Sequence, residues 1–120
     1  GATQHTLIRA ASMDNLQIRE GIERRIESMR EDLSGHSPSP LEELLVERII
    51  TCWLHVNQAE AVYSADLRYP DTPKEVFYLR RMESAQRRYL QAIKSLAQIR
   101  RLLGPSVQVN VANQQVNIAG

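Results

Sequence analysis

A helix-start signal that occurs twice constrains the fold of this chain more than any other feature. In Ser39–Glu42 and again in Thr72–Glu75, a hydroxyl residue that can cap a helix precedes a proline at the first helical position and a glutamate that can bond back to the cap. No helix breaker follows the first signal until Pro70, and the second segment ends in Gly104–Pro105, a cap glycine and a stop residue. The sequence therefore predicts two long helices.

These two helices, over about 40–69 and 73–103, are predicted to form an antiparallel hairpin, because only two or three residues connect them. Each has about 30 residues and would span roughly 45 Å at about 1.5 Å per residue. Apolar residues at steps of three and four trace one seam on each helix. The seam residues are Leu41, Leu45, Ile49, Cys52, Val56, Ala59 and Tyr63 on the first helix, and Leu79, Met82, Ala85, Tyr89, Ile93, Leu96 and Leu103 on the second.

The first of these helices has more apolar residues than one seam can bury. The surplus covers adjoining faces and consists of Leu44, Val46, Ile50, Trp53, Leu54 and Val62. An apolar face of this size must be covered by another helix, by another subunit, or by both. Trp53 is accordingly a candidate oligomerisation residue and otherwise a core residue.

A shorter N-terminal helix is predicted over about 14–33, where apolar residues recur on one helical face at Ile18, Ile22, Ile26, Met29 and Leu33. Residues 1–13 are interpreted as an N-terminal arm. The expected organisation is thus a three-helix domain at 14–104 in a mostly α fold, followed by a C-terminal segment at 105–120. Because the chain begins with Gly1 rather than Met, we expect it to be processed or to be part of a longer protein.

The C-terminal segment changes from a helical period to a period of two, which is typical of strands. Gln108–Ala112 is repeated almost unchanged as Gln115–Ala119, so a β-hairpin or strand segment is predicted over 107–119. Its edges carry no charge that would prevent pairing with another chain, so it is expected to pack on the helices or to pair between subunits, and a flexible tail is the alternative. The candidate oligomerisation residues here are Val107, Val109, Val111, Val116 and Ile118.

Charge is unevenly distributed, although the formal net charge is only +1. The segment 73–103 has eight basic and two acidic side chains, and the basic residues Arg80, Arg87, Lys94 and Arg101 recur every seven residues. In one interpretation they flank the seam and pair with acids of the preceding helix. The expected pairs are then Arg100 and Arg101 with Glu42 and Glu43, Lys94 with Glu47, and Arg81 with Glu60.

In the other interpretation the basic stripe contacts nucleic-acid phosphates, because Lys and Arg at such spacings can neutralise a backbone. The candidate contacts are Arg80, Arg87, Arg88 and Lys94. Among these, Arg87 and Arg88 are the best candidates, because the residues expected opposite them are Leu54 and His55, neither of which is a carboxylate.

No catalytic or metal-binding pattern is evident. His5, His36 and His55 fall in separate segments without zinc-like spacing, and His55 is interpreted as a partly buried polar residue. We therefore expect no enzyme activity, no cofactor and no small-molecule substrate. The single cysteine, Cys52, favours a reducing cytoplasmic setting, and no apolar run is long enough to predict a membrane span.

Three runs carry a resemblance to a group of uncharacterised bacterial proteins: SPLEELLVERIITCWLHVNQAEAVY, RRMESAQRRYLQAIKSLAQIRRLLGP and VQVNVANQQVNIAG. The resemblance covers about residues 14–120 and implies relatives rather than an activity. The architecture is also loosely similar to that of phage small terminase subunits, which join helical oligomerisation segments to C-terminal strands. The N-terminal helix-turn-helix of those subunits is not evident here.

Two hypotheses about function follow from these patterns. The favoured one is a non-catalytic, self-assembling structural or scaffold module that forms a homo-oligomer through helix faces and the C-terminal segment. The alternative is a nucleic-acid-binding accessory protein, small-terminase-like or related to mobile elements, that uses the arginine stripe of 73–103.

Overall fold

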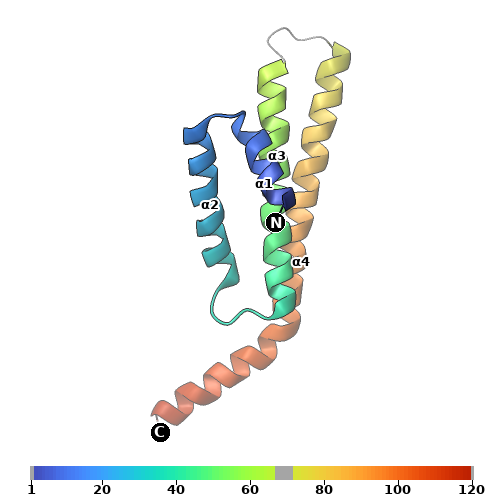
Figure 1. Ribbon diagram of the computed structural model, residues 1–120. Coiled ribbons are helices and arrows are strands. Elements are labelled where there is room, and N and C mark those ends of the chain that lie inside the picture. Colours follow the sequence, from blue (N-terminus) through green and yellow to red (C-terminus); the bar gives the residue numbers. More distant parts are fainter. Residues whose placement is uncertain (1, 67–71, 120) are drawn as a thin grey trace.

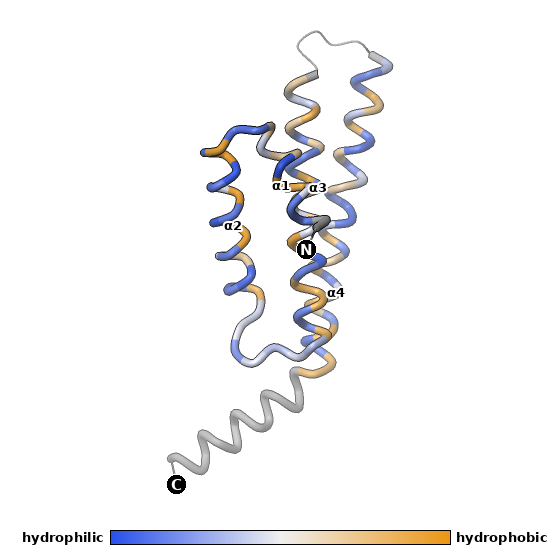
Figure 2. The backbone as a smooth tube through the Cα atoms, viewed as in Figure 1, coloured by the Kyte–Doolittle hydropathy of each residue, from blue (hydrophilic) through white to orange (hydrophobic). Residues whose placement is uncertain are grey.

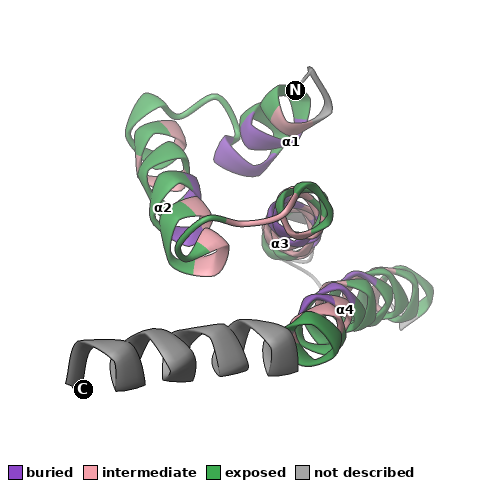
Figure 3. Ribbon diagram, turned by 90° about the horizontal axis from the view of Figure 1, so that it is seen from below, coloured by how far each residue is buried: buried purple, intermediate pink, exposed green. Residues whose placement is uncertain are grey.

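The computed structural model describes the backbone of residues 2–66 and 72–119 and the side chains of residues 4–65 and 73–103. Four helices follow one another in this part of the chain: α1 (Ala2–Ser12), α2 (Leu16–Ser34), α3 (Pro40–Asp66) and α4 (Thr72–Ala119). α3 is the central helix and contacts α1, α2 and α4, which are arranged around it (Figures 1 and 3). The predicted mostly α fold with an α3–α4 hairpin is confirmed.

Local hydrogen bonds explain where α2 and α3 begin. The Asn15 side chain accepts a hydrogen bond of 3.1 Å from the backbone N–H of Ile18, which caps α2. At the start of α3, the backbone N–H of Glu42 donates to Ser39 Oγ at 3.2 Å, and the backbone N–H of Ser39 donates to Glu42 Oε1 at 3.1 Å. This reciprocal pair is the predicted capping box. Between the two helices, Gly35 adopts a φ of 65°, which favours glycine, and ends α2.

The prediction of an N-terminal arm at 1–13 is wrong, because α1 is a helix that packs on the core. Its buried apolar residues Leu7, Ile8 and Ala11 lie on one helical face, and the first two belong to the main hydrophobic cluster. Three buried residues in a short segment give a weak periodic signal. Contacts with α3 rather than intrinsic propensity therefore stabilise α1. The described residues therefore form four helices, one more than the sequence predicted.

The surplus apolar face of α3 is covered in part within one chain, by α1 and α2, whereas Leu44 is exposed. Figure 2 shows hydrophobic residues along the whole of α3. Val46, Ile50 and Leu54 are almost completely buried, in a cluster that also contains Ile26 and Met29 of α2. Trp53 is half-buried and packs against the same cluster, which agrees with its interpretation as a core residue.

The predicted α3–α4 seam is confirmed only in part. Its members Ile49, Cys52 and Ala59 of α3, with Ala85 and Leu96 of α4, are buried. Four other seam positions are exposed instead, namely Leu41, Leu79, Ile93 and Leu103. On α4 the buried seam is displaced by one residue at Ala92, which takes the place expected for Ile93. Small residues at the contact allow the two helices to approach each other closely.

The predicted β-hairpin over 107–119 is not supported. The backbone of α4 is helical through Ala119, past the predicted end at Gly104–Pro105, and no strand occurs in 2–66 or 72–119. The side chains of Val107, Val109, Val111, Val116 and Ile118 lie outside the described residues. Their predicted role in oligomerisation stays a prediction.

Replacing Ile50, whose exposed fraction is 0%, with alanine should lower the free energy of unfolding by about 2–5 kcal/mol. The substitution removes buried methyl groups and leaves a cavity between α3 and its covering helices. Leu44→Ala is the matched control on the same helix, because Leu44 is 69% exposed, and it should change stability by less than about 0.5 kcal/mol. Urea unfolding followed by circular dichroism measures both values. Equal losses would contradict the burial of the Ile50 face.

Candidate functional site

A polar network at Glu47 connects the three N-terminal helices. Arg30 of α2 donates to both carboxylate oxygens of Glu47 on α3, at 2.9 and 3.0 Å, and Gln4 of α1 donates to the same carboxylate at 3.2 Å. The hydrogen bond from Arg30 is the main cause of the lowered pKa of Glu47, and partial burial opposes it. The predicted pair of Lys94 with Glu47 is wrong, because the carboxylate is already engaged by α2.

Arg100 makes the second connection between helices. Its Nε donates to Glu42 at 2.9 Å, and its Nη2 donates to the backbone carbonyl groups of Leu33 and Ser34 at the end of α2. The hydrogen bond from Arg100, followed by that from Ser39, lowers the pKa of Glu42. The predicted Arg100–Glu42 pair is confirmed. Both this pair and the Glu47 network join helices to one another, so they serve the fold.

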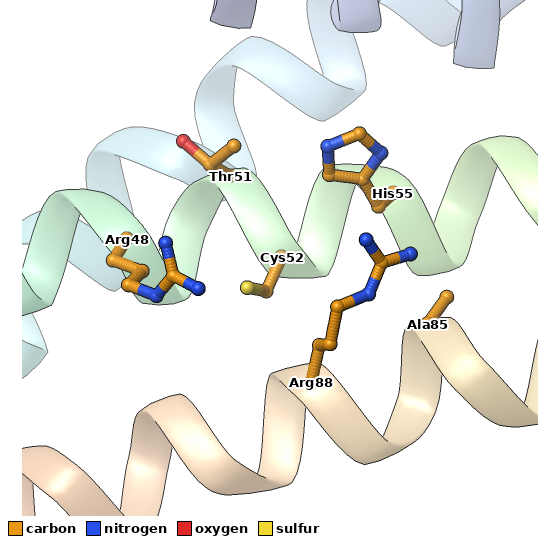
Figure 4. Close-up of a pocket in the computed structure, with 6 residues that line it drawn as sticks. All are labelled: Arg48, Thr51, Cys52, His55, Ala85 and Arg88. Carbon is orange, nitrogen blue, oxygen red and sulfur yellow. The ribbon is translucent and has the colours of Figure 1, made fainter.

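On one side of the α3–α4 hairpin, a cavity of about 190 Å³ opens between the two helices (Figure 4). We call it the α3–α4 groove. Residues at helical spacing on one face of α3 and two positions of α4 line it: Arg48, Thr51, Cys52, His55, Ala85 and Arg88. In Figure 4 the Arg88 guanidinium extends from α4 toward His55, and the Arg48 guanidinium lies on the other side of Cys52.

The α3–α4 groove is electrostatically positive. Arg48 and Arg88 are exposed, and neither forms an ion pair with any carboxylate among the side chains described. Partial burial lowers the pKa of His55, and the positive charges of Arg88 and Arg81 lower it further. The Thr51 hydroxyl is already committed, because it donates to the carbonyl of Glu47 at 3.0 Å and accepts from Gln4 at 3.2 Å.

The structure brings only one of the four candidate nucleic-acid contacts, Arg88, to this groove. Arg80, Arg87 and Lys94 are exposed on α4 but do not line it, and no acid in the described part of the chain pairs with them. Arg48 was not among the predicted site residues. Its position seven residues before His55, on the face that the hairpin register places opposite Arg88, is the signal that could have identified it.

The described residues contain no group of three His, Cys, Asp or Glu side chains that could hold a metal ion. Cys52 is a buried free thiol at the floor of the groove. No helix within the described ranges is both long enough and apolar enough to cross a membrane.

Comparisons of the chain with protein-family models, curated proteins and solved structures give no significant match.

The lowered pKa of His55 predicts a dependence of stability on pH. A histidine whose pKa is lower in the folded than in the unfolded state binds a proton more readily when the chain is unfolded. The free energy of unfolding therefore falls as pH decreases below the unfolded pKa of about 6.5. His55→Gln should therefore lose less stability than wild type between about pH 7.5 and 5.5. The measurement is the urea midpoint at both pH values.

His36→Gln is the control for this measurement, because His36 is exposed in the loop between α2 and α3. It should reproduce the pH dependence of the wild type. A His55→Gln variant with the same pH dependence as wild type would show that the imidazole environment described above has no effect on folding.

Proposed function

We propose that this chain is a non-catalytic structural module that self-assembles through an exposed apolar stripe of α4. The observation that supports the proposal is a second heptad-like series on this helix, at alternating steps of three and four. It consists of Val76, Leu79, Glu83, Gln86, Leu90, Ile93 and Ala97, all of them exposed. The side chain of Leu90, near the middle of the helix, is 58% exposed.

This stripe has the spacing of a coiled-coil seam but no partner within the described chain. The seam that packs on α3 includes Ala85, Ala92 and Leu96 and lies on another side of α4. Isolated exposed leucines are common on protein surfaces, but apolar residues repeated at seam spacing favour an interface. The polar pair Glu83 and Gln86 in the middle of the series would fix the register of two copies, as polar seam residues do in coiled coils.

Leu90→Glu should weaken self-association at least about tenfold, because burying a leucine contributes about 1.5–3 kcal/mol and the substitution places a charge at the seam. Sedimentation velocity over a range of concentrations measures the mass. Gln91→Glu is the matched control, since it adds the same charge to the neighbouring exposed residue, off the stripe. A wild type that is monomeric at all concentrations, or a Leu90→Glu variant with unchanged mass, would contradict the proposal.

The predicted role of the C-terminal segment is tested in the same experiment by truncation after Gly104. If this segment takes part in assembly, its removal weakens association while the helical circular dichroism of 2–103 is kept. If the α4 stripe is sufficient, the truncated chain keeps the wild-type mass. The two contributions are thereby separated.

The alternative function is binding of nucleic acid, and it is favoured by the basic side chains of α4 that lack acidic partners. Under this alternative, a labelled oligonucleotide binds with an affinity that falls steeply with salt, and Arg80→Glu combined with Arg87→Glu reduces both the affinity and its salt dependence. We expect the opposite result. The dissociation constant should exceed about 100 µM at physiological salt, which is the weak end of the range for ordinary non-specific binding. Fluorescence anisotropy at two salt concentrations decides between them.

A further inference from the structure

The arginines of the α3–α4 groove differ from those that join the helices. Arg30 and Arg100 each donate to at least two acceptors on other parts of the chain. Arg48 and Arg88 have no such acceptor among the described residues, although they come from different helices and line the same cavity. The fold therefore places two guanidinium groups at one site without using either of them.

The other groups that line the groove favour an anion and disfavour a cation. None of its six lining residues is a carboxylate, and Glu47, which precedes Arg48 in the sequence, is bound by Arg30. His55 adds an imidazole N–H that can donate a hydrogen bond in the neutral form. The small residues Cys52 and Ala85 form the floor and leave the space between the helices open.

The size and the positive charge of the groove limit the class of ligand that can bind there. Its volume of about 190 Å³ is several times the roughly 30 Å³ that one water molecule occupies in the liquid, so a tetrahedral oxyanion fits with part of its hydration shell. Guanidinium groups bind phosphate oxygens in a bidentate manner. Two of them, on different helices in a groove that no carboxylate lines, match the two negative charges of a phosphate monoester better than the single charge of a phosphodiester.

We propose that the α3–α4 groove binds a phosphate group in its dianionic form, as free phosphate or as the terminal phosphate of a small molecule, with Arg48 and Arg88 as its main ligands and His55 as a third donor. The proposal is independent of the assembly proposed above. Arg88 and Leu90 are two residues apart and therefore point about 200° away from each other around α4.

Isothermal titration with inorganic phosphate and with phenyl phosphate, at constant ionic strength set by sodium chloride, tests the proposal on the full chain. Both ligands should bind in a saturable manner with one site per chain. Arg48→Gln and Arg88→Gln should each weaken binding at least tenfold. Arg88→Lys, which keeps the charge but loses the bidentate donor geometry, should weaken it by less than Arg88→Gln does.

Arg87→Gln is the matched control, because Arg87 is an exposed neighbour that does not line the groove. It removes the same charge and should change the affinity less than twofold. Equal losses in Arg87→Gln and Arg88→Gln would overturn the proposal, since they would indicate general surface electrostatics, and so would the absence of saturable binding by wild type. Circular dichroism and thermal melting confirm that each variant is folded, as expected for exposed arginines without ion pairs.

A short single-stranded oligonucleotide without terminal phosphates distinguishes the monoester from a nucleic-acid backbone. Its binding, if any, should be the same in wild type and Arg88→Gln. An oligonucleotide that binds more tightly than phenyl phosphate and loses this affinity in Arg88→Gln would overturn the assignment of the groove to a monoester. Self-association measured alongside remains at the wild-type level in Arg48→Gln and Arg88→Gln, so failure of one proposal does not entail failure of the other.

Discussion

α3 carries apolar side chains on three of its sides, and the rest of the architecture depends on the need to remove them from water. One side packs on α4, and Val46, Ile50 and Leu54 require further cover from α1 and α2. A single hairpin could not provide this cover. The N-terminal helices are therefore components of the core, and α1 owes its helical structure to the apolar surface that α3 offers.

The polar contacts then select one arrangement of helices among those that would bury the same apolar area. Arg30 binds Glu47 through two hydrogen bonds, and Arg100 links the end of α2 to the first turn of α3. Both sets of hydrogen bonds lie where helices meet. Partial burial at such places strengthens charge-assisted hydrogen bonds. In the α3–α4 groove, by contrast, Arg48 and Arg88 have no such acceptor among the described residues. The division of arginines into bound and unbound groups thus follows the layout of the helices.

The sequence was sufficient to predict contacts between residues that are close together along the chain or related by the hairpin register. The capping box of Ser39 and Glu42 spans four positions, and the Arg100–Glu42 pair follows from counting outward from the turn. It was insufficient where a third helix intervenes. The register alone pairs Lys94 with Glu47, but Arg30 approaches from α2, whose position depends on packing. The helical structure of α1 was missed for the same reason, because it depends on packing against α3. Arg48 was missed although the hairpin register places it opposite Arg88.

The small seam residues of α4 have a consequence for how this molecule could diverge. Ala85 and Ala92 set the distance between the axes of α3 and α4, and this distance in turn determines the width of the cavity beside them. The charged groups at its rim extend from exposed positions on long, flexible side chains. The dimensions of the cavity and the chemistry of its rim are therefore controlled by different residues. In a related chain, a change of one methyl group at the helix contact can widen or narrow the cavity while the positively charged side chains at its rim stay the same.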